Sequence, residues 1–241
     1  MTTPICKVAD IIYVRFELTE FEAQKKYLNH FGMMLVHEDE NSIYFRGTGS
    51  SPYIYVATKG SENKYVGSAY KANNFSDLEA LSKEFNIDII ENTEPGGGHK
   101  VTLIDPDGVE VEVCHGMKEA EPVAVVSKVL NTGQSKQREN ELQRFGKAAD
   151  EWQVHGDKWI YELTSKVKRL GHTAINCKDP QASVDWYSNV LGFLVSNNCI
   201  GPDGNSMGAF MRCDQGNKPV DHHTMNNMGL PGGNEVPTYG H

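Results

Sequence analysis

Residues 169–193 read RLGHTAINCKDPQASVDWYSNVLGF, and this stretch decides the fold. The apolar run Leu170–Cys177 predicts a strand, and Asp179 followed by Pro180 is typical of a helix N-cap and first helical position. Three apolar residues recur at helical spacing after that cap: Val184, Tyr187 and Leu191. Gly192 predicts the end of the helix, because glycine readily adopts the left-handed conformation found there. The stretch therefore predicts a strand followed closely by an amphipathic helix.

The same plan occurs earlier in the chain, at residues 10–33. Ile11–Leu18 predicts a strand, and Gly32 predicts the end of the helix that follows it. Three apolar residues mark one face of that helix: Ala23, Tyr27 and Phe31. The two copies align with a single gap, so the sequence predicts two modules built on a common plan.

Alternating or β-rich segments and turn residues predict the other elements of the first module. In chain order these are strands Ser42–Arg46 and Pro52–Ala57 around the turn 47–51, strand Tyr65–Ala72, helix Phe75–Phe85, and strands Lys100–Ile104 and Val109–Cys114 around the turn 105–108. Each pair of strands around a turn predicts a hairpin.

We divide the chain into an N-terminal module (residues 1–116), a charged helical connector (117–168) and a C-terminal module (169–241). Four apolar residues in the connector have helical spacing: Leu142, Phe145, Ala149 and Trp152. They predict at least one amphipathic helix. We expect this helix to pack across both modules or against a second subunit, with a substrate lid as the alternative.

Charge and composition limit the class of function. The 241 residues carry a formal net charge of −9, which argues against a surface that follows nucleic-acid phosphates, because such binders need clustered Lys and Arg. The start of the chain lacks a signal-peptide pattern, and no apolar run approaches the ~18 residues of a membrane span. The five scattered cysteines predict neither a disulfide framework nor a thiolate zinc site. We therefore expect a soluble, cytoplasmic protein that binds a small neutral or anionic ligand, and neither nucleic acid nor a membrane.

Two stretches carry a resemblance to a known family: LGHTAINCKDPQASVDWYSNVLGF and, further on, AFMRCDQGNKPVDHHT at residues 209–224. Together they resemble the metal-bearing module of the vicinal oxygen chelate (glyoxalase/bleomycin resistance/dioxygenase) superfamily. The chain is most like the two-module extradiol ring-cleaving dioxygenases of the catechol 2,3-dioxygenase type. The resemblance implies an α+β fold of two tandem glyoxalase-type βαβββ modules, which form cupped mixed sheets.

The resemblance also implies a divalent metal bound by two histidines and one glutamate. His172 matches the first metal-binding histidine, and His223, in DHHT, matches the second. Fe(II) is the metal implied, with Mn(II) or another divalent ion as the alternative. Such a ligand set leaves three coordination positions open, which suits iron that holds a catechol-like aromatic diol and O2 together. The implied reaction is extradiol cleavage of the ring with insertion of both oxygen atoms.

The first module serves as an internal control for this assignment. Tyr13 stands where His172 stands, and Tyr53 stands where His223 stands. Only Glu112, in the stretch DPDGVEVEV, has a ligand-type side chain at a matching position. The resemblance therefore implies an N-terminal module that keeps the fold without a metal, and we expect Glu112 to be an ordinary exposed or salt-bridged strand carboxylate.

The residues beside the second histidine have supporting roles. Successive strand side chains point to opposite faces, so we expect His222 to lie beside the site or to be exposed. Asp221 shares the strand face of His223, where a carboxylate more often orients a ligand histidine than binds the metal. Asp221 or Glu235 as the completing ligand is the lesser alternative. By resemblance His241, in TYGH, lines the substrate pocket and is assigned a catalytic role.

The sequence departs from the family pattern in two ways. The interval of 59 residues from Tyr53 to Glu112, counted on from His223, places the third ligand near position 282, beyond the last residue. The family also uses an acid–base histidine between its two metal-binding ones, a contribution typically worth ~10²–10⁴ in rate, and no histidine occurs between residues 173 and 221. Asp203 or Asn205 are the remaining candidates for that role.

Three functions therefore stay open. The first is an extradiol-type dioxygenase that binds Fe(II), a catechol-like diol and O2. The second is a non-redox metal-dependent isomerase, lyase or epimerase of the same fold, which the missing acid–base histidine favours. The third is an inactive ligand-binding or truncated family member. In each case exposed strand edges favour a homo-oligomer.

Overall fold

The computed structural model describes residues 3–124, 167–202, 204–229 and 238–239. Its helices and strands are, in chain order, β1 (Val8–Leu18), α1 (Glu22–His30), β2 (Met34–Glu38), β3 (Ser42–Arg46), β4 (Tyr55–Lys59), β5 (Lys64–Ala72), α2 (Phe75–Phe85), β6 (Ile90–Glu91), β7 (His99–Ile104), β8 (Glu110–His115), β9 (Thr173–Asn176), α5 (Pro180–Leu191), β10 (Leu194–Ile200), β11 (Ser206–Arg212), β12 (Met225–Met228) and β13 (Thr238–Tyr239).

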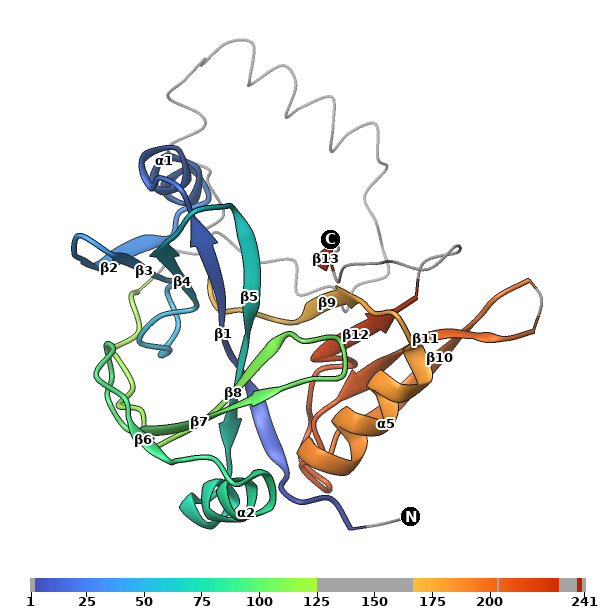
Figure 1. The fold of residues 1–241 in the computed structure, drawn as a ribbon. Helices are drawn as coiled ribbons and strands as arrows, with labels where there is room; N and C mark the ends of the chain where they lie inside the picture. Colours follow the sequence, from blue (N-terminus) through green and yellow to red (C-terminus); the bar gives the residue numbers. More distant parts are fainter. Residues whose placement is uncertain (1–2, 125–166, 203, 230–237, 240–241) are drawn as a thin grey trace.

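The strands form two sheets, one from each module (Figure 1). The N-terminal sheet has the order β2-β3-β4-β1-β5-β8-β7-β6, so two βαβββ units, β1–β4 with α1 and β5–β8 with α2, meet through their first strands. The C-terminal sheet has the order β10-β11-β12-β9-β13, a third unit whose first strand pairs antiparallel with β13, as β1 pairs with β5. The predicted fold class is confirmed, and the N-terminal module contains two βαβββ units.

Backbone hydrogen bonds show how the third unit corresponds to the first. The Val14 N–H donates to the Ile54 carbonyl at 3.1 Å, and the Thr173 N–H donates to the Thr224 carbonyl at 3.2 Å. Both bonds join the first strand of a unit to the residue just before its last strand, and both strand pairs are parallel. Val14 is thus the counterpart of Thr173, and Ile54 is the counterpart of Thr224.

One residue earlier, the same register makes Tyr13 the counterpart of His172 and Tyr53 the counterpart of His223. This is the correspondence that the sequence predicts.

A β-bulge recurs at the same place in both units. The pairing of β2 with β3 shifts between Leu35 and His37, and the pairing of β10 with β11 shifts between Val195 and Asn197. A bulge leaves one residue unpaired and changes the direction in which the next side chain points. Ser196 is the unpaired residue of β10, and Asn197 becomes the counterpart of His37.

Local signals set the ends of α5. The Asp179 carboxylate accepts hydrogen bonds from the backbone N–H groups of Gln181 and Ala182, both at 3.0 Å. This is the N-cap that the sequence predicts. Gly192 ends the helix with a φ of 72°, a left-handed conformation that glycine adopts without strain.

Two strands are shorter than the sequence predicts. The segment predicted as Pro52–Ala57 forms a strand over Tyr55–Lys59. The segment predicted as Leu170–Cys177 forms a strand only over Thr173–Asn176. Its paired length matches that of β12, its partner of four residues. His172 therefore lies directly before β9.

The face marked by apolar residues on α1 is not the buried one. Tyr27 and Phe31 are about half exposed and contact each other, with ring centroids 4.8 Å apart. Leu28 is the buried residue of this helix, where it packs into a cluster with Ile43 and Phe45 of β3. Helix α1 thus contacts the sheet along a line of residues next to the predicted apolar face.

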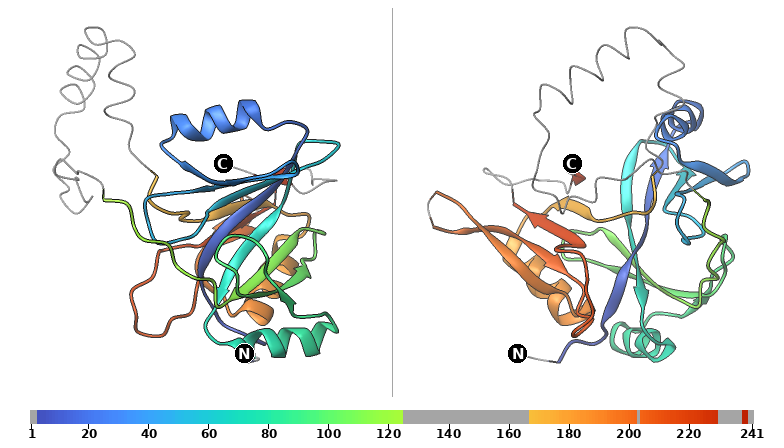
Figure 2. Two further views of the ribbon diagram at one scale, coloured as in Figure 1. Left: turned by 90° about the vertical axis from the view of Figure 1, so that its left-hand side faces the viewer. Right: turned by 180° about the vertical axis from the view of Figure 1, so that it is seen from behind.

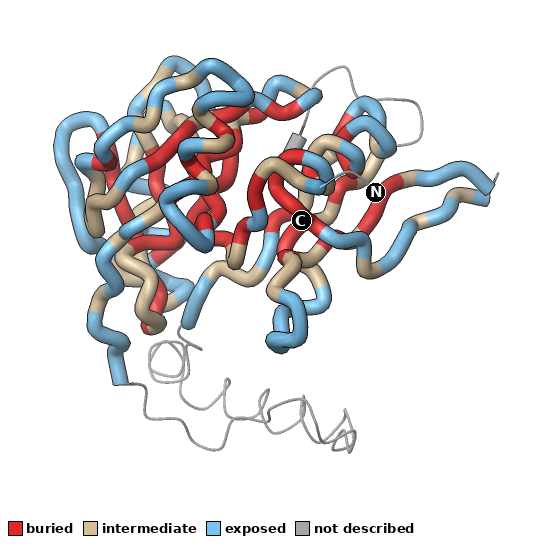
Figure 3. Tube along the Cα trace, turned by 90° about the horizontal axis from the view of Figure 1, so that it is seen from below, coloured by how far each residue is buried: buried red, intermediate tan, exposed pale blue. Residues whose placement is uncertain are grey.

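The two modules share one hydrophobic core. Helix α5 lies between the modules, and its buried Tyr187 donates a hydrogen bond to Asp105 of the N-terminal module at 3.1 Å (Figures 1 and 2). Tyr70 of β5 packs edge-on against Phe193 at 5.3 Å and also contacts Met225. Figure 3 shows buried segments in both modules, whereas the β10–β11 hairpin projects from the body with an exposed end. The C-terminal module is thus fixed to the N-terminal one by packing.

The predicted connector helix, with Leu142 and Trp152, lies outside the described residues. The proposed module bounds at residues 116 and 168 stay predictions.

Two expectations about class can be compared with the structure. All five cysteines lie among the described residues and are free thiols there. Within the segments that the structure describes, no helix combines the length and apolar character needed to cross a membrane. The cytoplasmic location and the homo-oligomer stay predictions.

Candidate metal centre

The side chains of His172 and His223 lie against each other. Their ring centroids are 4.4 Å apart, and the ring planes are inclined at 54°. Each residue lies just before a strand, and these strands, β9 and β12, are parallel neighbours, so the sheet brings both histidines to one end. Imidazole nitrogens about 2.0–2.1 Å from a shared ion, at adjacent coordination positions, are roughly 3 Å apart. The pair is therefore close enough to bind one divalent ion.

The environment favours neutral imidazole at His223. Burial lowers the pKa of this side chain, and the nearby His172 and His222 lower it further, against an opposing effect of Asp221. Phe210 of β11 packs edge-on against the ring, with centroids 4.9 Å apart. Metal binding requires a deprotonated ring nitrogen, so a lowered pKa keeps His223 competent as a ligand at neutral pH.

His222 and Asp221 have other partners. The exposed His222 places its Nδ1 3.2 Å from Nδ1 of His223, and its Nε2 lies 2.8 Å from Oδ1 of Asn197. Asp221 forms an exposed ion pair with Arg169. The His222 ring therefore lies beside that of His223, whereas the Asp221 carboxylate is bound by a guanidinium group.

The third ligand is not found among the described residues. In residues 3–124, 167–202, 204–229 and 238–239, no group of three or more His, Cys, Asp or Glu side chains could hold a metal ion. Asp203, Glu235 and His241 lie outside the described residues, and Asn205 lies in the turn before β11. The described residues therefore bring together two histidine side chains, His172 and His223, without a third ligand-type group beside them.

The counterpart positions in the N-terminal module hold a pair of buried tyrosines. The rings of Tyr13 and Tyr53 have centroids 4.6 Å apart and planes inclined at 36°. The Tyr13 hydroxyl donates a hydrogen bond to Glu112 at 2.8 Å, and the Tyr53 hydroxyl donates one to Glu94 at 2.5 Å. Two carboxylates thus lie beside the two tyrosines.

Two buried cations neutralise these carboxylates. Arg15 lies 2.7 Å from Glu94 and 3.1 Å from Glu112, and Lys100 lies 2.5 Å from Glu112 and 3.5 Å from Glu94. We call these four residues the ion-pair network. Each of their side chains is at most 14% exposed. Glu112 is a salt-bridged strand carboxylate, as predicted. It belongs to a cluster of two cations and two carboxylates whose formal charges cancel.

The pKa directions agree with this description of the network. Burial tends to raise the pKa of the Glu94 carboxyl, but Arg15 and Lys100 hold it below its ordinary value. The pKa of Arg15 is raised by Glu112 and Glu94 in spite of burial. Burial also raises the pKa of Tyr13 well above its ordinary value. The glutamate and the guanidinium are therefore charged at neutral pH, and the phenol is neutral.

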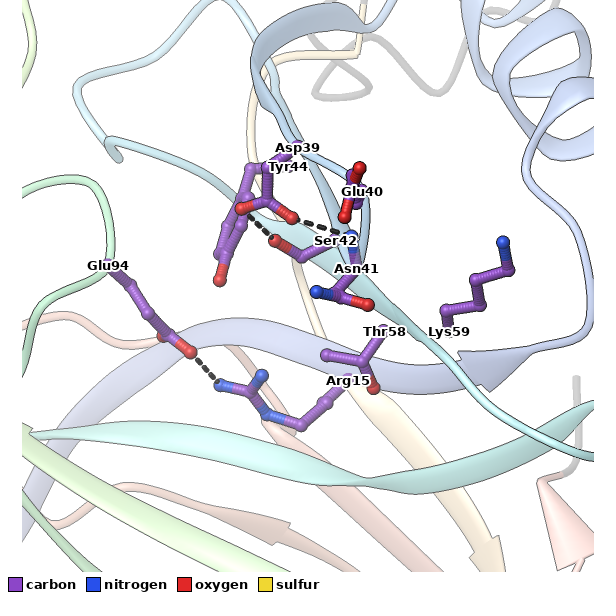
Figure 4. Close-up of a pocket in the computed structure, with 9 residues that line it drawn as sticks. All are labelled: Arg15, Asp39, Glu40, Asn41, Ser42, Tyr44, Thr58, Lys59 and Glu94. Atoms are coloured by element: carbon purple, nitrogen blue, oxygen red, sulfur yellow. Dashed lines mark hydrogen bonds and ion pairs between the residues drawn. The ribbon is translucent and has the colours of Figure 1, made fainter.

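An open pocket of about 620 Å³ adjoins the network. Figure 4 shows Arg15 and Glu94 paired across one side of it, with Ser42 and Tyr44 of β3 on another. The charged groups of the network that border this pocket already bind each other. The N-terminal pocket therefore borders the ion-pair network through Arg15 and Glu94, whose charges are satisfied within the protein.

Sequence reasoning missed two parts of these sites. Asn197 was not considered, because a bulge in β10 that aims its side chain at His222 is not visible in the sequence. The network around Glu112 was also missed. Glu94 belongs to a loop, and only the folded sheet brings it beside Arg15 and Lys100.

Comparison with known proteins agrees with the sequence resemblance. Residues 169–220 match the family model of the Glyoxalase/Bleomycin resistance protein/Dioxygenase superfamily, a stretch that includes His172 and ends before His223. No curated protein matches the chain by sequence.

Solved structures share the fold at low sequence identity. The Mn(II)-bound glyoxalase of Novosphingobium aromaticivorans has a TM-score of 0.67 at 20% identity, with 97% of this chain and 64% of that chain covered. Homoprotocatechuate 2,3-dioxygenase of Brevibacterium fuscum, in complex with 3,4-dihydroxyphenylacetate, has a TM-score of 0.67 at 17% identity and the same coverage. The homoprotocatechuate 2,3-dioxygenase of Arthrobacter globiformis has a TM-score of 0.65 at 19% identity, with 97% and 63% covered.

The chain spans less than two thirds of the length of these structures. They establish its fold and leave its activity to be argued from the site. The two comparisons agree: residues 169–220 carry the sequence pattern of the Glyoxalase/Bleomycin resistance protein/Dioxygenase superfamily, and the chain shares its fold with a glyoxalase and with extradiol dioxygenases.

Proposed function

We propose that the chain binds a divalent metal ion through His172 and His223 and acts as an extradiol-type dioxygenase on a catechol-like aromatic diol. Fe(II) is the proposed ion. Mn(II) is the alternative, in view of the similar fold of the Mn(II)-bound glyoxalase. The proposed partners are the diol and O2.

One observation carries the proposal: the fold brings three positions, on or just before strands, together. In the N-terminal module these positions hold Tyr13 on β1, Tyr53 before β4 and Glu112 on β8, with the Glu112 carboxylate 2.8 Å from the Tyr13 hydroxyl. In the C-terminal module the first two positions hold His172 and His223. A carboxylate at the third position would complete a site of two histidines and one carboxylate, the ligand set typical of non-haem Fe(II) oxygenases.

The described residues define what the protein contributes to such a site. The two imidazoles would hold the ion at one end of the sheet, and Phe210 would provide an apolar wall beside His223. When bound, Fe(II) supplies open coordination positions and redox chemistry for a chelated diol and O2. The role of His223 is to present an unprotonated nitrogen, which its lowered pKa supports.

A second candidate function is a metal-dependent isomerase or lyase without redox chemistry. The absence of any histidine between residues 173 and 221 favours it, because the acid–base histidine that ring cleavage uses in this family has no counterpart there. The glyoxalase among the similar structures is consistent with this alternative. A protein that binds a ligand without catalysis is the third possibility.

The test is metal content after anaerobic loading with Fe(II) and desalting, compared among the wild type, His172→Ala and His223→Ala. Tyr53→Phe is the matched control, because it alters the counterpart position in the other module. We expect near-stoichiometric iron in the wild type and the control, and loss of iron in both histidine variants. Equal iron in all four proteins would overturn the proposed site.

The iron-loaded wild type then distinguishes the functions. Oxygen uptake on addition of catechol, with appearance of a ring-opened product, is the outcome expected for the dioxygenase. Bound iron without oxygen uptake across a panel of aromatic diols would argue against it and favour the non-redox candidate. A folded protein that binds no metal would leave the ligand-binding alternative.

A further inference from the structure

We infer that Asn197 and His222 form a hydrogen-bonded relay that fixes the ring of His223 in one tautomer, with its Nδ1 protonated and its Nε2 lone pair free for a metal ion. The inference deepens the proposed function and rests on it for the role of His223 as a ligand. Asn197 and His222 are positioning residues here, because they act through His223.

The direction of the relay follows from the chemistry of its atoms. Oδ1 of Asn197 can only accept a hydrogen bond, so the His222 Nε2 that lies 2.8 Å away must be the protonated nitrogen. A neutral imidazole carries one N–H, which makes Nδ1 of His222 an acceptor. Nδ1 of His223 lies 3.2 Å from that acceptor and must therefore donate. The remaining nitrogen of His223, Nε2, then carries a free lone pair.

The strand next to the histidines is shaped to support this relay. Ser196, the unpaired residue of the β10 bulge, donates a hydrogen bond from Oγ to the backbone carbonyl of His222 at 2.6 Å. Arg212 on β11 donates in turn to Ser196 Oγ at 3.0 Å and to the Val195 carbonyl at 3.2 Å. The bulge thus anchors the backbone of His222 and at the same time directs Asn197 toward its ring.

The N-terminal module has the bulge without the relay. His37 occupies the place of Asn197 there, and it pairs with Asp39 at 3.2 Å. Pro52, which precedes Tyr53, occupies the place of His222 and has no side-chain donor or acceptor. The relay is therefore found beside the histidine pair and not beside its tyrosine counterpart. A hydrogen-bond partner on the second nitrogen of a ligand imidazole sets the tautomer and orientation of the ring. In this relay His222 is that partner for His223.

The first test uses the metal-free protein, so that it does not depend on metal binding. Long-range ¹H–¹⁵N correlation spectra of ¹⁵N-labelled protein distinguish the two neutral tautomers of each histidine ring, with His222 and His223 assigned by their alanine variants. We expect the Nε2–H tautomer for His222 and the Nδ1–H tautomer for His223. In Asn197→Ala we expect His223 to move toward the Nε2–H form that free imidazole side chains favour. A wild-type His223 in the Nε2–H form would overturn the inference.

The second test measures Mn(II) affinity from the loss of the free-ion electron paramagnetic resonance signal. Asn197→Ala and His222→Ala should weaken binding by about 10- to 100-fold, the usual effect of removing a hydrogen-bond partner of a ligand histidine. Asn197→Asp keeps the acceptor oxygen and should retain most of the affinity. His37→Ala, the matched change in the other module, should leave it unchanged. Wild-type affinity in both Asn197→Ala and His222→Ala would overturn the relay.

The two tests separate this inference from the proposed function. If the wild type binds no Mn(II) or Fe(II), the proposed function fails, while the tautomer spectra still decide whether the relay exists. If the wild type binds metal and its spectra show the opposite tautomer, the relay fails and the metal site stands.

Discussion

The histidine pair and the tyrosine pair occupy equivalent places and have opposite character. His172 and His223 lie with centroids 4.4 Å apart, and Tyr13 and Tyr53 with centroids 4.6 Å apart. The tyrosines are fully buried and bind carboxylates neutralised by Arg15 and Lys100, whereas His172 is exposed. The backbone thus decides where the two side chains meet. The side chains differ in chemistry: the tyrosines are part of a buried, neutral cluster, whereas the histidines have ring nitrogens that could bind a ligand.

The aromatic neighbour of each pair supports the comparison. Tyr44 of β3 packs edge-on against Tyr53 at 5.1 Å, and Phe210 of β11 packs edge-on against His223 at 4.9 Å. The sheet registers make Tyr44 and Phe210 counterparts. The scaffold around the second member of each pair is therefore shared, so the difference in chemistry comes from the pair itself and from its polar partners.

The largest expected effect comes from breaking the ion-pair network. Glu112→Ala would leave the buried Arg15 and Lys100 with one carboxylate between them, and we expect the free energy of unfolding to fall by about 3–5 kcal/mol. His172→Ala, at an exposed position of the counterpart pair, should change it by no more than about 0.5 kcal/mol. Urea unfolding of the metal-free proteins measures both. Similar losses in the two variants would contradict the assignment of a structural role to one pair and a binding role to the other.

The second effect is a pH dependence of the ion-pair network. The pKa of Glu94 is held below its ordinary value of 4.5, so its stabilising contribution is fully present above about pH 4.5 and is lost as the pH falls through the folded-state pKa. Glu94→Gln should cost roughly 1.5–3 kcal/mol at pH 7, the usual range for hydrogen bonds to charged groups. Urea unfolding of wild type and variant between pH 7 and 3 should show their difference shrinking toward the acid end.

Glu40→Gln, at an exposed glutamate beside the same pocket, is the control and should show no such trend. A difference between wild type and Glu94→Gln that stays constant down to pH 3 would mean that the Glu94 carboxylate is not held ionised by its cations.

The smallest effect concerns the titration of His223. Burial, His172 and His222 lower its pKa from 6.5, so its ring signals should titrate below that value in an NMR pH series of the metal-free protein. His172→Ala removes one neighbouring positive charge at low pH, so it should move the midpoint back toward 6.5. In the wild type, the lowered pKa means that His223 binds fewer protons in the folded state than in the unfolded state. The titration of His223 therefore makes the free energy of unfolding rise with pH between its folded-state pKa and about 6.5. A midpoint at or above 6.5 in the wild type would contradict the described surroundings.

Much of the fold follows from local sequence signals. The cap at Asp179, the glycine at Gly192 and the helix Phe75–Phe85 are where the sequence predicts them, because each depends on neighbouring residues. Tyr27 and Phe31 contact each other, but both are about half exposed, because spacing marks an apolar face without showing whether anything packs on it. The same limit applies to β9, whose length follows from its partner strand.

The candidate site divides in the same way. In the sequence, the repeat aligns Tyr13 with His172 and Tyr53 with His223, and the family resemblance implies that the two histidines are metal ligands. Folding adds three contacts that the sequence does not reveal: the rings of each pair meet, Arg15 and Lys100 bind both glutamates of the network, and a bulge directs Asn197 toward His222. The physical reason is range. Helix caps and periodic patterns act between residues close in the chain, whereas strand register and buried charge pairing join residues that meet only after the sheets have formed.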